Sequence, residues 1–321
     1  MRIFAAEPSV RRIESALSGH ELILLDGKGV ARSGGMEIAL ADIKPEIVWM
    51  TFDSIMGGQL DRFFGVALAG GVKWLHTQQT GLDSPRYREV VAKGIRLTNS
   101  HAQAPAIAEY TLANVLAETW PVAASRAAQA SGEWKRMPFR ELAEQNWLII
   151  GLGAIGREIA KRARGFGCKV TGINRNGRAD PDADATATLA DLPKLLPTAD
   201  VVVLAAARTS ETTDLVNEKF VAAMKPGSII VNIARGELIV DDALLAGLDK
   251  GTPGIAILDV FRQEPLPKGH RYWTHPKVRV TGHTSSTGTG TLARADNFFL
   301  ENLRRYQAGE KLLSEVTAES F

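Results

Sequence analysis

The sequence has 321 residues, enough for two domains of ordinary size that each bury a core. Hydrophobic residues make up 45% of the chain and charged residues 23%, a composition typical of a soluble globular protein. The formal net charge is +2 and no basic stripe stands out, so neither nucleic acid nor a membrane is expected as a partner.

Cysteine and histidine usage argues against disulfides and metal sites. Cys168 is the only cysteine, which excludes an intrachain disulfide. Metal-ligand spacings such as H-x-x-x-H do not occur, so no metal is expected.

Glu7, Arg11 and Arg12 interrupt the N-terminal segment where a signal peptide needs an apolar core, and no run approaches about 18 apolar residues. We therefore expect a cytoplasmic protein.

Residues 1–99 alternate short apolar runs with helical patterns. The predicted strands are 2–7, 21–26, 47–52, 72–78 and 95–99, and the predicted helices are Val10–Leu17, Gln59–Ala67 and Pro85–Lys93. This alternation indicates a parallel sheet with crossover helices. A helix rich in small residues, Ala104–Glu118, follows and is expected to bridge two domains.

A second series of strands and helices begins at Trp147. Its predicted strands are 147–153, 168–174, 201–206, 228–234, 254–260 and 278–283, and a last helix is predicted over 294–306. Six strands in succession with helices between them indicate a doubly wound sheet, which binds ligands at the carboxyl ends of its strands.

The first strand of this series runs into a glycine motif, NWLIIGLGAIG. Gly151 allows a tight turn, Gly153 lets the backbone approach a pyrophosphate, and Gly156 lets the following helix pack closely on the strand. That helix starts near Ala154 and Ile155 and would direct its unpaired N–H groups at the phosphates. The motif therefore predicts dinucleotide binding, the alternative being a tightly packed turn.

The end of the second strand bears on which dinucleotide binds. An acidic residue for the ribose hydroxyls is expected about 20 residues after the glycines, but Asn174 stands there, followed by Arg175 and Arg178. Without the carboxylate a 2′-phosphate is no longer repelled, and two arginines can clamp it. We expect NADP(H) to be preferred and NAD(H) to be possible. The alternative is that both arginines are solvated and the specificity is dual.

Each later strand ends in a loop with a reactive side chain. These loops deliver Arg235, then Asp259 and Glu264, and finally His283, all at the carboxyl edge of one sheet. Arg235 can bind a carboxylate or carbonyl oxygen. His283 can supply a proton to that oxygen, with Glu264 orienting the imidazole and favouring its protonated form. Taken singly, each of these residues could equally be structural or solvated.

With these motifs the chain resembles the D-isomer-specific 2-hydroxyacid dehydrogenases. The matching stretches include GLGAIG, SIIVNIARGELIVDDALLAGL, LDVFRQEPLP and VTGH, in family order. The resemblance implies that Arg235, Glu264 and His283 form the catalytic set and that Asp259 holds the nicotinamide carboxamide. It also implies contacts from Ala234 to the cofactor. The backbone amides of Gln79, Thr80 and Gly81 are expected to bind the substrate carboxylate.

Three features of the chain bear on how it compares with members of this family. The family usually has proline before its catalytic histidine, where this chain has Gly282. Formate dehydrogenases pair their histidine with glutamine, and Glu264 argues against that activity. The loop 50–56 offers Phe52, Met56 and the acid Asp53 where phosphoglycerate dehydrogenases place basic residues, which favours an unphosphorylated substrate.

The sequence therefore predicts an α/β protein with two doubly wound parallel-sheet domains. A Rossmann cofactor domain, residues 102–287, is expected to be inserted in a flavodoxin-like substrate domain formed by 1–101 and 288–321. The predicted function is NAD(P)H-dependent reduction of a small unphosphorylated 2-oxo acid to the D-2-hydroxy acid, with His283 as proton donor. The alternative is a non-enzymatic dinucleotide sensor that resembles a corepressor. A homodimer is expected from the resemblance.

Overall fold

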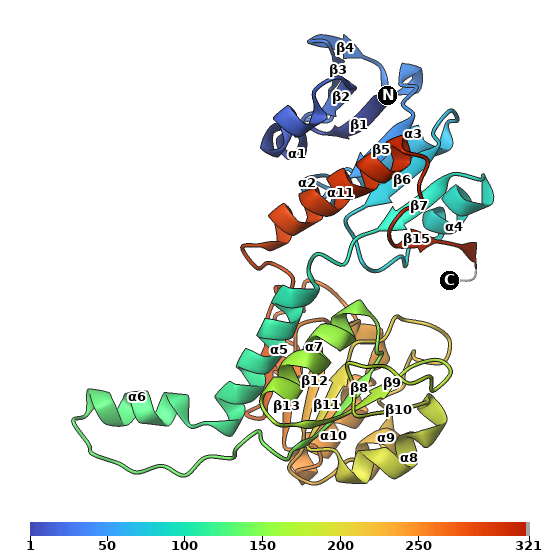
Figure 1. Ribbon diagram of the computed structural model, residues 1–321. Helices are drawn as coiled ribbons and strands as arrows, with labels where there is room; N and C mark the ends of the chain where they lie inside the picture. The colour runs from blue at the N-terminus through green and yellow to red at the C-terminus, as the bar shows by residue number, and fades with distance from the viewer. Residues whose placement is uncertain (319–321) are drawn as a thin grey trace. The chain divides into compact units, whose positions relative to one another are not determined.

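The computed structural model describes residues 1–318 and divides into two compact units. Unit 1 comprises Met1–Gln103 and Thr289–Phe321, and unit 2 comprises Ala104–Gly288. Each unit is built on one mostly parallel sheet with helices on it (Figure 1), which confirms the predicted fold class. Among the described residues, no helix is both long and apolar enough to cross a membrane.

Unit 1 has an eight-stranded sheet in the order β15-β7-β6-β5-β1-β2-β3-β4. Its parallel strands are β1 (Arg2–Ala6), β2 (Glu21–Leu25), β5 (Ile47–Met50), β6 (Trp74–Thr77) and β7 (Arg96–Asn99). The order β2-β1-β5-β6-β7 is the flavodoxin-like order. Antiparallel strands that the sequence pattern did not predict complete the two edges: β3 (Ala31–Ser33), β4 (Met36–Ile38) and β15 (Glu315–Val316).

The helices of unit 1 are α1 (Glu7–Arg12), α2 (Phe52–Met56), α3 (Leu60–Leu68), α4 (Pro85–Ala92) and α11 (Thr291–Gln307). The predicted helix Val10–Leu17 was wrong in its limits. The α-helix begins at Glu7 because Pro8 favours the first turn, and it ends at Arg12, leaving only a 3-10 turn over Glu14–Leu17. On the sheet, the ring of Phe299 from α11 stacks on Trp49 at 4.2 Å, which fixes this helix to the core.

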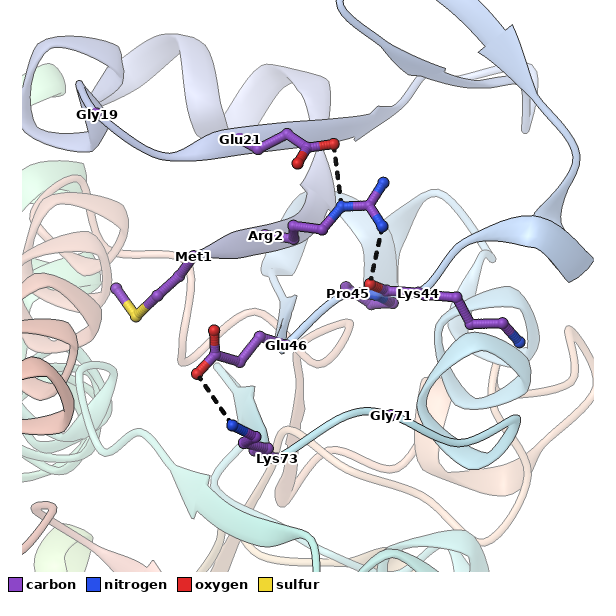
Figure 2. Close-up of a pocket in the computed structure, with 9 residues that line it drawn as sticks. All are labelled: Met1, Arg2, Gly19, Glu21, Lys44, Pro45, Glu46, Gly71 and Lys73. Carbon is purple, nitrogen blue, oxygen red and sulfur yellow. Dashed lines mark hydrogen bonds and ion pairs between the residues drawn. The ribbon is translucent and has the colours of Figure 1, made fainter.

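A cavity of 410 Å³ opens at the amino ends of the unit 1 strands (Figure 2). Its polar lining is largely paired internally. Arg2 forms an ion pair with Glu21 at 3.0 Å, and Lys73 lies 3.9 Å from Glu46. Open α/β sheets bind ligands at the carboxyl ends of their strands, so this cavity lies at the wrong edge for such a site.

Unit 2 has seven parallel strands in the order β10-β9-β8-β11-β12-β13-β14. They are β8 (Asn146–Ile150), β9 (Lys169–Ile173), β10 (Ala185–Ala187), β11 (Val201–Leu204), β12 (Ile229–Asn232), β13 (Ile255–Leu258) and β14 (Val278–Val280). The first six positions follow the Rossmann order. Only the short edge strand β10 was absent from the sequence prediction.

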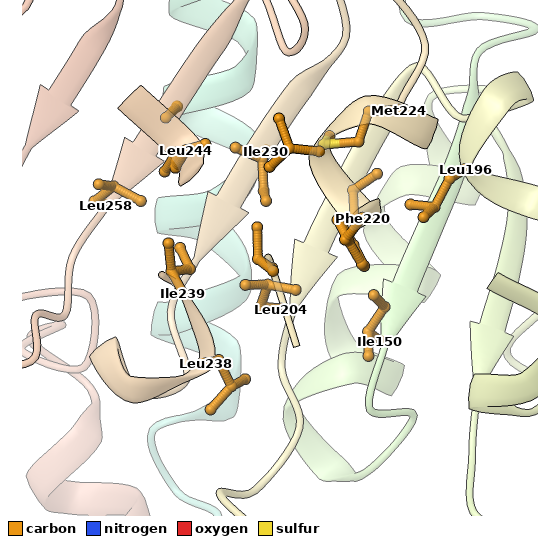
Figure 3. Close-up of a cluster of buried hydrophobic side chains, with 14 of the residues drawn as sticks. Ile150, Leu196, Leu204, Phe220, Met224, Ile230, Leu238, Ile239, Leu244 and Leu258 are labelled. Carbon is orange, nitrogen blue, oxygen red and sulfur yellow. The ribbon is translucent and has the colours of Figure 1, made fainter. Parts of the chain in front are cut away.

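The helices of unit 2 are α5 (Ala104–Thr119), α6 (Val122–Ala130), α7 (Ala154–Gly165), α8 (Leu192–Leu195), α9 (Glu218–Ala223) and α10 (Asp241–Lys250). Aliphatic side chains of β8, β11, β12 and β13 pack against residues of α9 and α10 on one face of the sheet (Figure 3). Ile107 and Leu112 of α5 join the core on a second face with Ile159 of α7. The sheet is buried on both faces, and its strands therefore read as continuous apolar runs.

A buried carboxylate connects the amino ends of these strands. Asp200, directly before β11, is 5% exposed and accepts hydrogen bonds from Lys225 Nζ at 2.7 Å and the Asn146 backbone N–H at 2.9 Å. Arg140 donates to the same carboxylate. Burial opposes ionisation of Asp200, but the bonds from Lys225 and Asn146 and the charge of Arg140 outweigh it and lower the pKa of Asp200.

We expect Asp200→Asn to reduce the free energy of unfolding at pH 7 by about 1–3 kcal/mol, because charge-assisted hydrogen bonds are lost. Since the pKa is lowered in the folded state, this stabilisation exists above the usual pKa of aspartate and is lost as the pH falls through the lowered value. Urea unfolding at several pH values measures it. Asp242→Asn, whose carboxylate is 95% exposed, is the control. Equal stability of Asp200→Asn and the wild type at pH 7 would contradict the prediction.

Candidate functional site

The glycine motif forms a turn in which the backbone comes very close to its neighbours. Gly151, directly after β8, has φ +104°, and a Cβ on it would lie 2.4 Å from the backbone N of Ala206. A Cβ on Gly156 would lie 2.1 Å from the carbonyl oxygen of Gly151. No side chain fits at either position, so these two glycines are needed for packing.

Gly153 differs, because a Cβ there would meet nothing within 4 Å. It is the N-cap residue of α7, and no side chain caps this 12-residue helix. The first N–H groups of α7, including those near Ala154 and Ile155, therefore have no side-chain cap and lie at the positive end of the helix dipole. An uncapped helix end beside a glycine with free space fits the pyrophosphate of a dinucleotide.

The turn after β9 carries two exposed arginines. Asn174 is fixed within the turn, donating from Nδ2 to the Arg178 carbonyl at 2.8 Å and accepting from the Asn176 N–H at 3.3 Å. Within residues 1–318, neither the Arg175 nor the Arg178 guanidinium pairs with a carboxylate. Asp180, the nearest acid along the chain, is bonded by Arg157 at 2.7 Å. The turn therefore presents two unneutralised cations.

Arg235 follows β12 in a turn that is shaped by a buried amide. The fully buried Asn232 accepts from the Ala234 N–H at 3.1 Å and donates to the Arg235 carbonyl at 2.8 Å. The next residue, Gly236, lies so close to the loop after β13 that a Cβ would be 1.9 Å from the carbonyl carbon of Phe261. This contact places the half-buried Arg235 beside the segment that carries Glu264.

Glu264 and His283 are paired, as the sequence predicted. Glu264 Oε2 lies 2.8 Å from His283 Nδ1, and Glu264 Oε1 accepts the Phe261 N–H at 3.0 Å. The imidazole is half exposed, so its other nitrogen remains accessible. His283 has φ +51°, a left-handed conformation that is uncommon for a residue with a side chain and clusters at functional sites.

Asp259 is fully buried and organises the turn around His283. Its carboxylate accepts from the Thr281 hydroxyl at 2.6 Å and from the N–H groups of Thr284 at 2.8 Å and Ser285 at 2.9 Å. The Asp259 carbonyl also accepts the His283 N–H at 2.8 Å. No sequence pattern pointed to Thr281, Thr284 or Ser285, because their contacts with Asp259 depend on how two strand ends meet.

The loop 79–81 lies in unit 1, after β6. Gln79 Oε1 accepts from the Tyr87 hydroxyl at 2.6 Å, and its N–H donates to Thr77 at 3.2 Å. The Thr80 hydroxyl donates a hydrogen bond to the Ser100 carbonyl at 2.9 Å, and the Thr80 carbonyl accepts one from Asn99.

The described residues contain no group of three or more His, Cys, Asp or Glu side chains that could hold a metal ion.

The site geometry can be set beside known proteins. The sequence model described as "D-isomer specific 2-hydroxyacid dehydrogenase, NAD binding domain" matches residues 112–285. This range contains the glycine motif together with Arg235, Glu264 and His283.

Individual proteins that match this chain point to the same family. A glyoxylate reductase from Thermococcus gammatolerans is 31% identical over 240 residues, 72% of this chain and 72% of the relative. A 4-methyl-2-oxopentanoate reductase A from Aspergillus oryzae is 31% identical over 267 residues, 81% of this chain and 79% of the relative. A D-isomer specific 2-hydroxyacid dehydrogenase from Xanthobacter autotrophicus Py2, crystallised with NADPH and MES, matches with a TM-score of 0.77 at 25% identity, covering 99% of each chain.

Proposed function

The chain belongs to the family of D-isomer specific 2-hydroxyacid dehydrogenases, which are NAD(P)-dependent oxidoreductases, and we propose that it reduces small unphosphorylated 2-oxo acids to D-2-hydroxy acids. The observation that carries this proposal is the pair of Glu264 and His283, 2.8 Å apart, at the same sheet edge as Arg235 and the glycine motif. Family membership also favours this enzyme over a non-enzymatic sensor.

The chemistry follows from how each side chain is held. A nicotinamide dinucleotide, when bound, supplies the hydride that reaches C2 of the 2-oxo acid. His283 holds the proton at Nε2, because Nδ1 faces Glu264, and gives it to the carbonyl oxygen as that oxygen gains charge. Glu264 orients the imidazole and is itself oriented by the Phe261 N–H. Arg235 binds the substrate's carboxylate or carbonyl oxygen through its planar guanidinium.

The proposed binding roles elsewhere rest on the same reasoning. The N–H groups around Gly153, Ala154 and Ile155 hold the pyrophosphate, and Ala234 and Asp259 contact the nicotinamide end. The backbone of Gln79, Thr80 and Gly81 binds the substrate carboxylate. These binding roles are proposed from the family resemblance, and substitution of each residue tests its role.

The substrate is proposed to lack phosphate. The only basic side chain bonded to the loop 50–56 in the described structure is Arg12, which is matched by two carboxylates, those of Asp53 at 2.6 Å and Asp296 at 2.7 Å. A phosphate would meet this net negative cluster together with the apolar Phe52. The relatives from Thermococcus and Aspergillus are named for glyoxylate and 4-methyl-2-oxopentanoate. A panel of 2-oxo acids with and without phosphate tests the substrate class.

We expect His283→Ala to lower kcat by roughly 100-fold or more, the usual scale for a positioned general acid, while the dissociation constant of NADPH stays unchanged. Steady-state kinetics and a fluorescence titration measure the two quantities. His275→Ala is the matched control, because the His275 imidazole bonds Asp249 and the Lys277 N–H rather than Glu264 and the variant should retain activity. Reduction of 2-oxo acids by His283→Ala at the wild-type rate would rule out the proton-donor role.

NADPH is the proposed preferred cofactor. A 2′-phosphate near Arg175 and Arg178 gains charge-assisted hydrogen bonds, whereas the side chain of Asn174 is already occupied within the turn. Both arginines are exposed, so solvent screening weakens each contact. NADPH is present in the related Xanthobacter structure. The preference is therefore expected to be partial.

We expect kcat/KM with NADPH to exceed that with NADH by roughly 10- to 100-fold, since each charge-assisted bond contributes about 1.5–3 kcal/mol before screening. Arg175→Ala should reduce the value for NADPH and leave that for NADH nearly unchanged. Lys219→Ala removes an exposed positive charge from α9 and serves as control. Equal kcat/KM values for the two cofactors in the wild type would contradict the proposal that Arg175 and Arg178 bind the 2′-phosphate.

A homodimer is proposed from the exposed apolar residues of unit 2. Helix α6 and the segment 131–140 project away from the rest of this unit (Figure 1). This projection carries Trp134, 96% exposed, and Phe139, 55% exposed, and it starts next to Trp120, 51% exposed. Large aromatic side chains left in solvent are typical of association surfaces.

We expect light scattering at micromolar concentration to give the mass of two chains. Trp134→Ser should shift the equilibrium toward the monomer because it removes a large apolar contact. Phe166→Ser, which removes another exposed aromatic ring at the end of α7, should leave the dimer intact. A wild-type protein that is monomeric at this concentration would refute the proposal.

A further inference from the structure

The turn that carries His283 has little packing of its own. Gly282, His283 and Thr284 are exposed, and a Cβ on Gly282 would meet nothing within 4 Å. His283 is also held at φ +51°, a conformation that an exposed turn does not keep unless surrounding contacts impose it. The order of this turn must therefore come from hydrogen bonds, namely those at its two ends and those that His283 makes with the Asp259 carbonyl and with Glu264.

Both ends of the turn are bonded to Asp259. On one side the carboxylate accepts from the Thr281 hydroxyl, and on the other it accepts from the N–H groups of Thr284 and Ser285. Gly282 and His283 lie between these anchors. The Thr281 anchor therefore restrains one side of the turn, in addition to the bonds that His283 makes with the Asp259 carbonyl and Glu264.

Tyr110, on α5, bonds the Thr281 anchor from outside. Its hydroxyl lies 2.6 Å from Thr281 Oγ1. A carboxylate only accepts, so the Thr281 hydroxyl hydrogen is committed to Asp259 and Tyr110 must be the donor to Thr281. Burial, together with the nearby charge of Asp259, raises the pKa of Tyr110 to about 12 despite the bond with Thr281, so the donor proton is retained at neutral pH. The three residues form a directed chain that ends on the carboxylate.

We infer that Tyr110 is a positioning residue for His283, acting through Thr281 and Asp259. This chain of hydrogen bonds restrains the turn, which Gly282 cannot do because it has no side chain to pack against neighbouring residues. The inference rests on the proposed function in one respect, namely that His283 is the proton donor. Tyr110 does not contact the imidazole, and its effect is on where the imidazole is held. A purely structural role would instead be the packing of its ring in the core formed with Ile107 and Trp147.

Tyr110→Phe separates these two roles, because it keeps the ring and removes the donor. We expect kcat to fall about 3- to 10-fold, the range for one lost hydrogen bond, with a smaller change in KM. Tyr272→Phe is the matched control. It removes another buried tyrosine hydroxyl in unit 2, which bonds Asp241 at 3.0 Å and has no link to Asp259. This control should unfold at a similarly lowered temperature while keeping its kcat.

Substitutions at Thr281 test the order of the chain. Thr281→Val removes the hydroxyl and should lower kcat further than Tyr110→Phe, whereas Thr281→Ser keeps the hydroxyl and should stay within about twofold of the wild type. The double variant Tyr110→Phe with Thr281→Val should be no slower than Thr281→Val alone, because Tyr110 acts only through that hydroxyl. Losses that multiply in the double variant would overturn the chain.

Amide hydrogen exchange supplies a readout that does not depend on turnover. In Tyr110→Phe, exchange should accelerate in the segment 281–285 and remain unchanged in the strands of unit 2; Tyr272→Phe should leave 281–285 unchanged. Unchanged exchange in this segment of Tyr110→Phe, or a kcat equal to that of Tyr272→Phe, would overturn the inference. If His283→Ala is fully active, the proposed function fails while the exchange result still decides whether Tyr110 orders the turn.

Discussion

The buried carboxylate of Asp259 is the interaction on which the site depends. A carboxylate removed from water is costly unless donors surround it, and here the donors are a hydroxyl and two backbone amides of the turn that follows β14. The cost of burial is thus offset only while the turn keeps its shape. Since His283 lies between the anchored residues, the same requirement that stabilises Asp259 also places the imidazole.

Close backbone contacts bring the remaining parts of the site to this point. Gly236 lets the Arg235 turn touch the loop after β13, and Gly151 lets the glycine motif touch the segment after β11. Each contact joins the ends of neighbouring parallel strands, β12 with β13 and β8 with β11, where the connecting loops crowd together. A side chain at either glycine would separate these loops, so the two positions set how closely the glycine motif and the Arg235 turn approach the neighbouring loops.

The sequence predicted what local patterns encode. Apolar runs and helical periodicity located every parallel strand of both sheets except β10, and the glycine motif followed directly from its spacing. Pairing of Glu264 with His283 was predictable because the two residues lie in the loops that follow the adjacent strands β13 and β14. By contrast, the hairpin of β3 and β4 and helix α6 carry weak sequence patterns. The two strands are only three residues long, and most residues of α6 are not buried. The limits of α1 were missed because Pro8 outweighed the apolar spacing.

The hydrogen bonds of Tyr110, Thr281 and Asp259 could not be read from the sequence either. The three residues come from α5, the end of β14 and the end of β13, and 171 positions separate Tyr110 from Thr281. Threonine and tyrosine hydroxyls have so many possible partners that only the folded arrangement selects one. Non-local polar contacts of this kind refine a site whose outline the strand order has already determined.

Rigidity is distributed unevenly over the site, and this has a consequence for specificity. Glu264 is held by a backbone N–H, His283 by Glu264 and Asp259, and the Arg235 turn by Asn232. The side chains of Arg175 and Arg178, in contrast, have no carboxylate partner in the described part of the chain. Catalytic groups must stay within a few tenths of an ångström of a productive geometry, whereas a phosphate clamp of exposed charges can adjust to its ligand. Under the proposed function, cofactor preference can therefore change through the turn after β9 without disturbing Glu264 and His283.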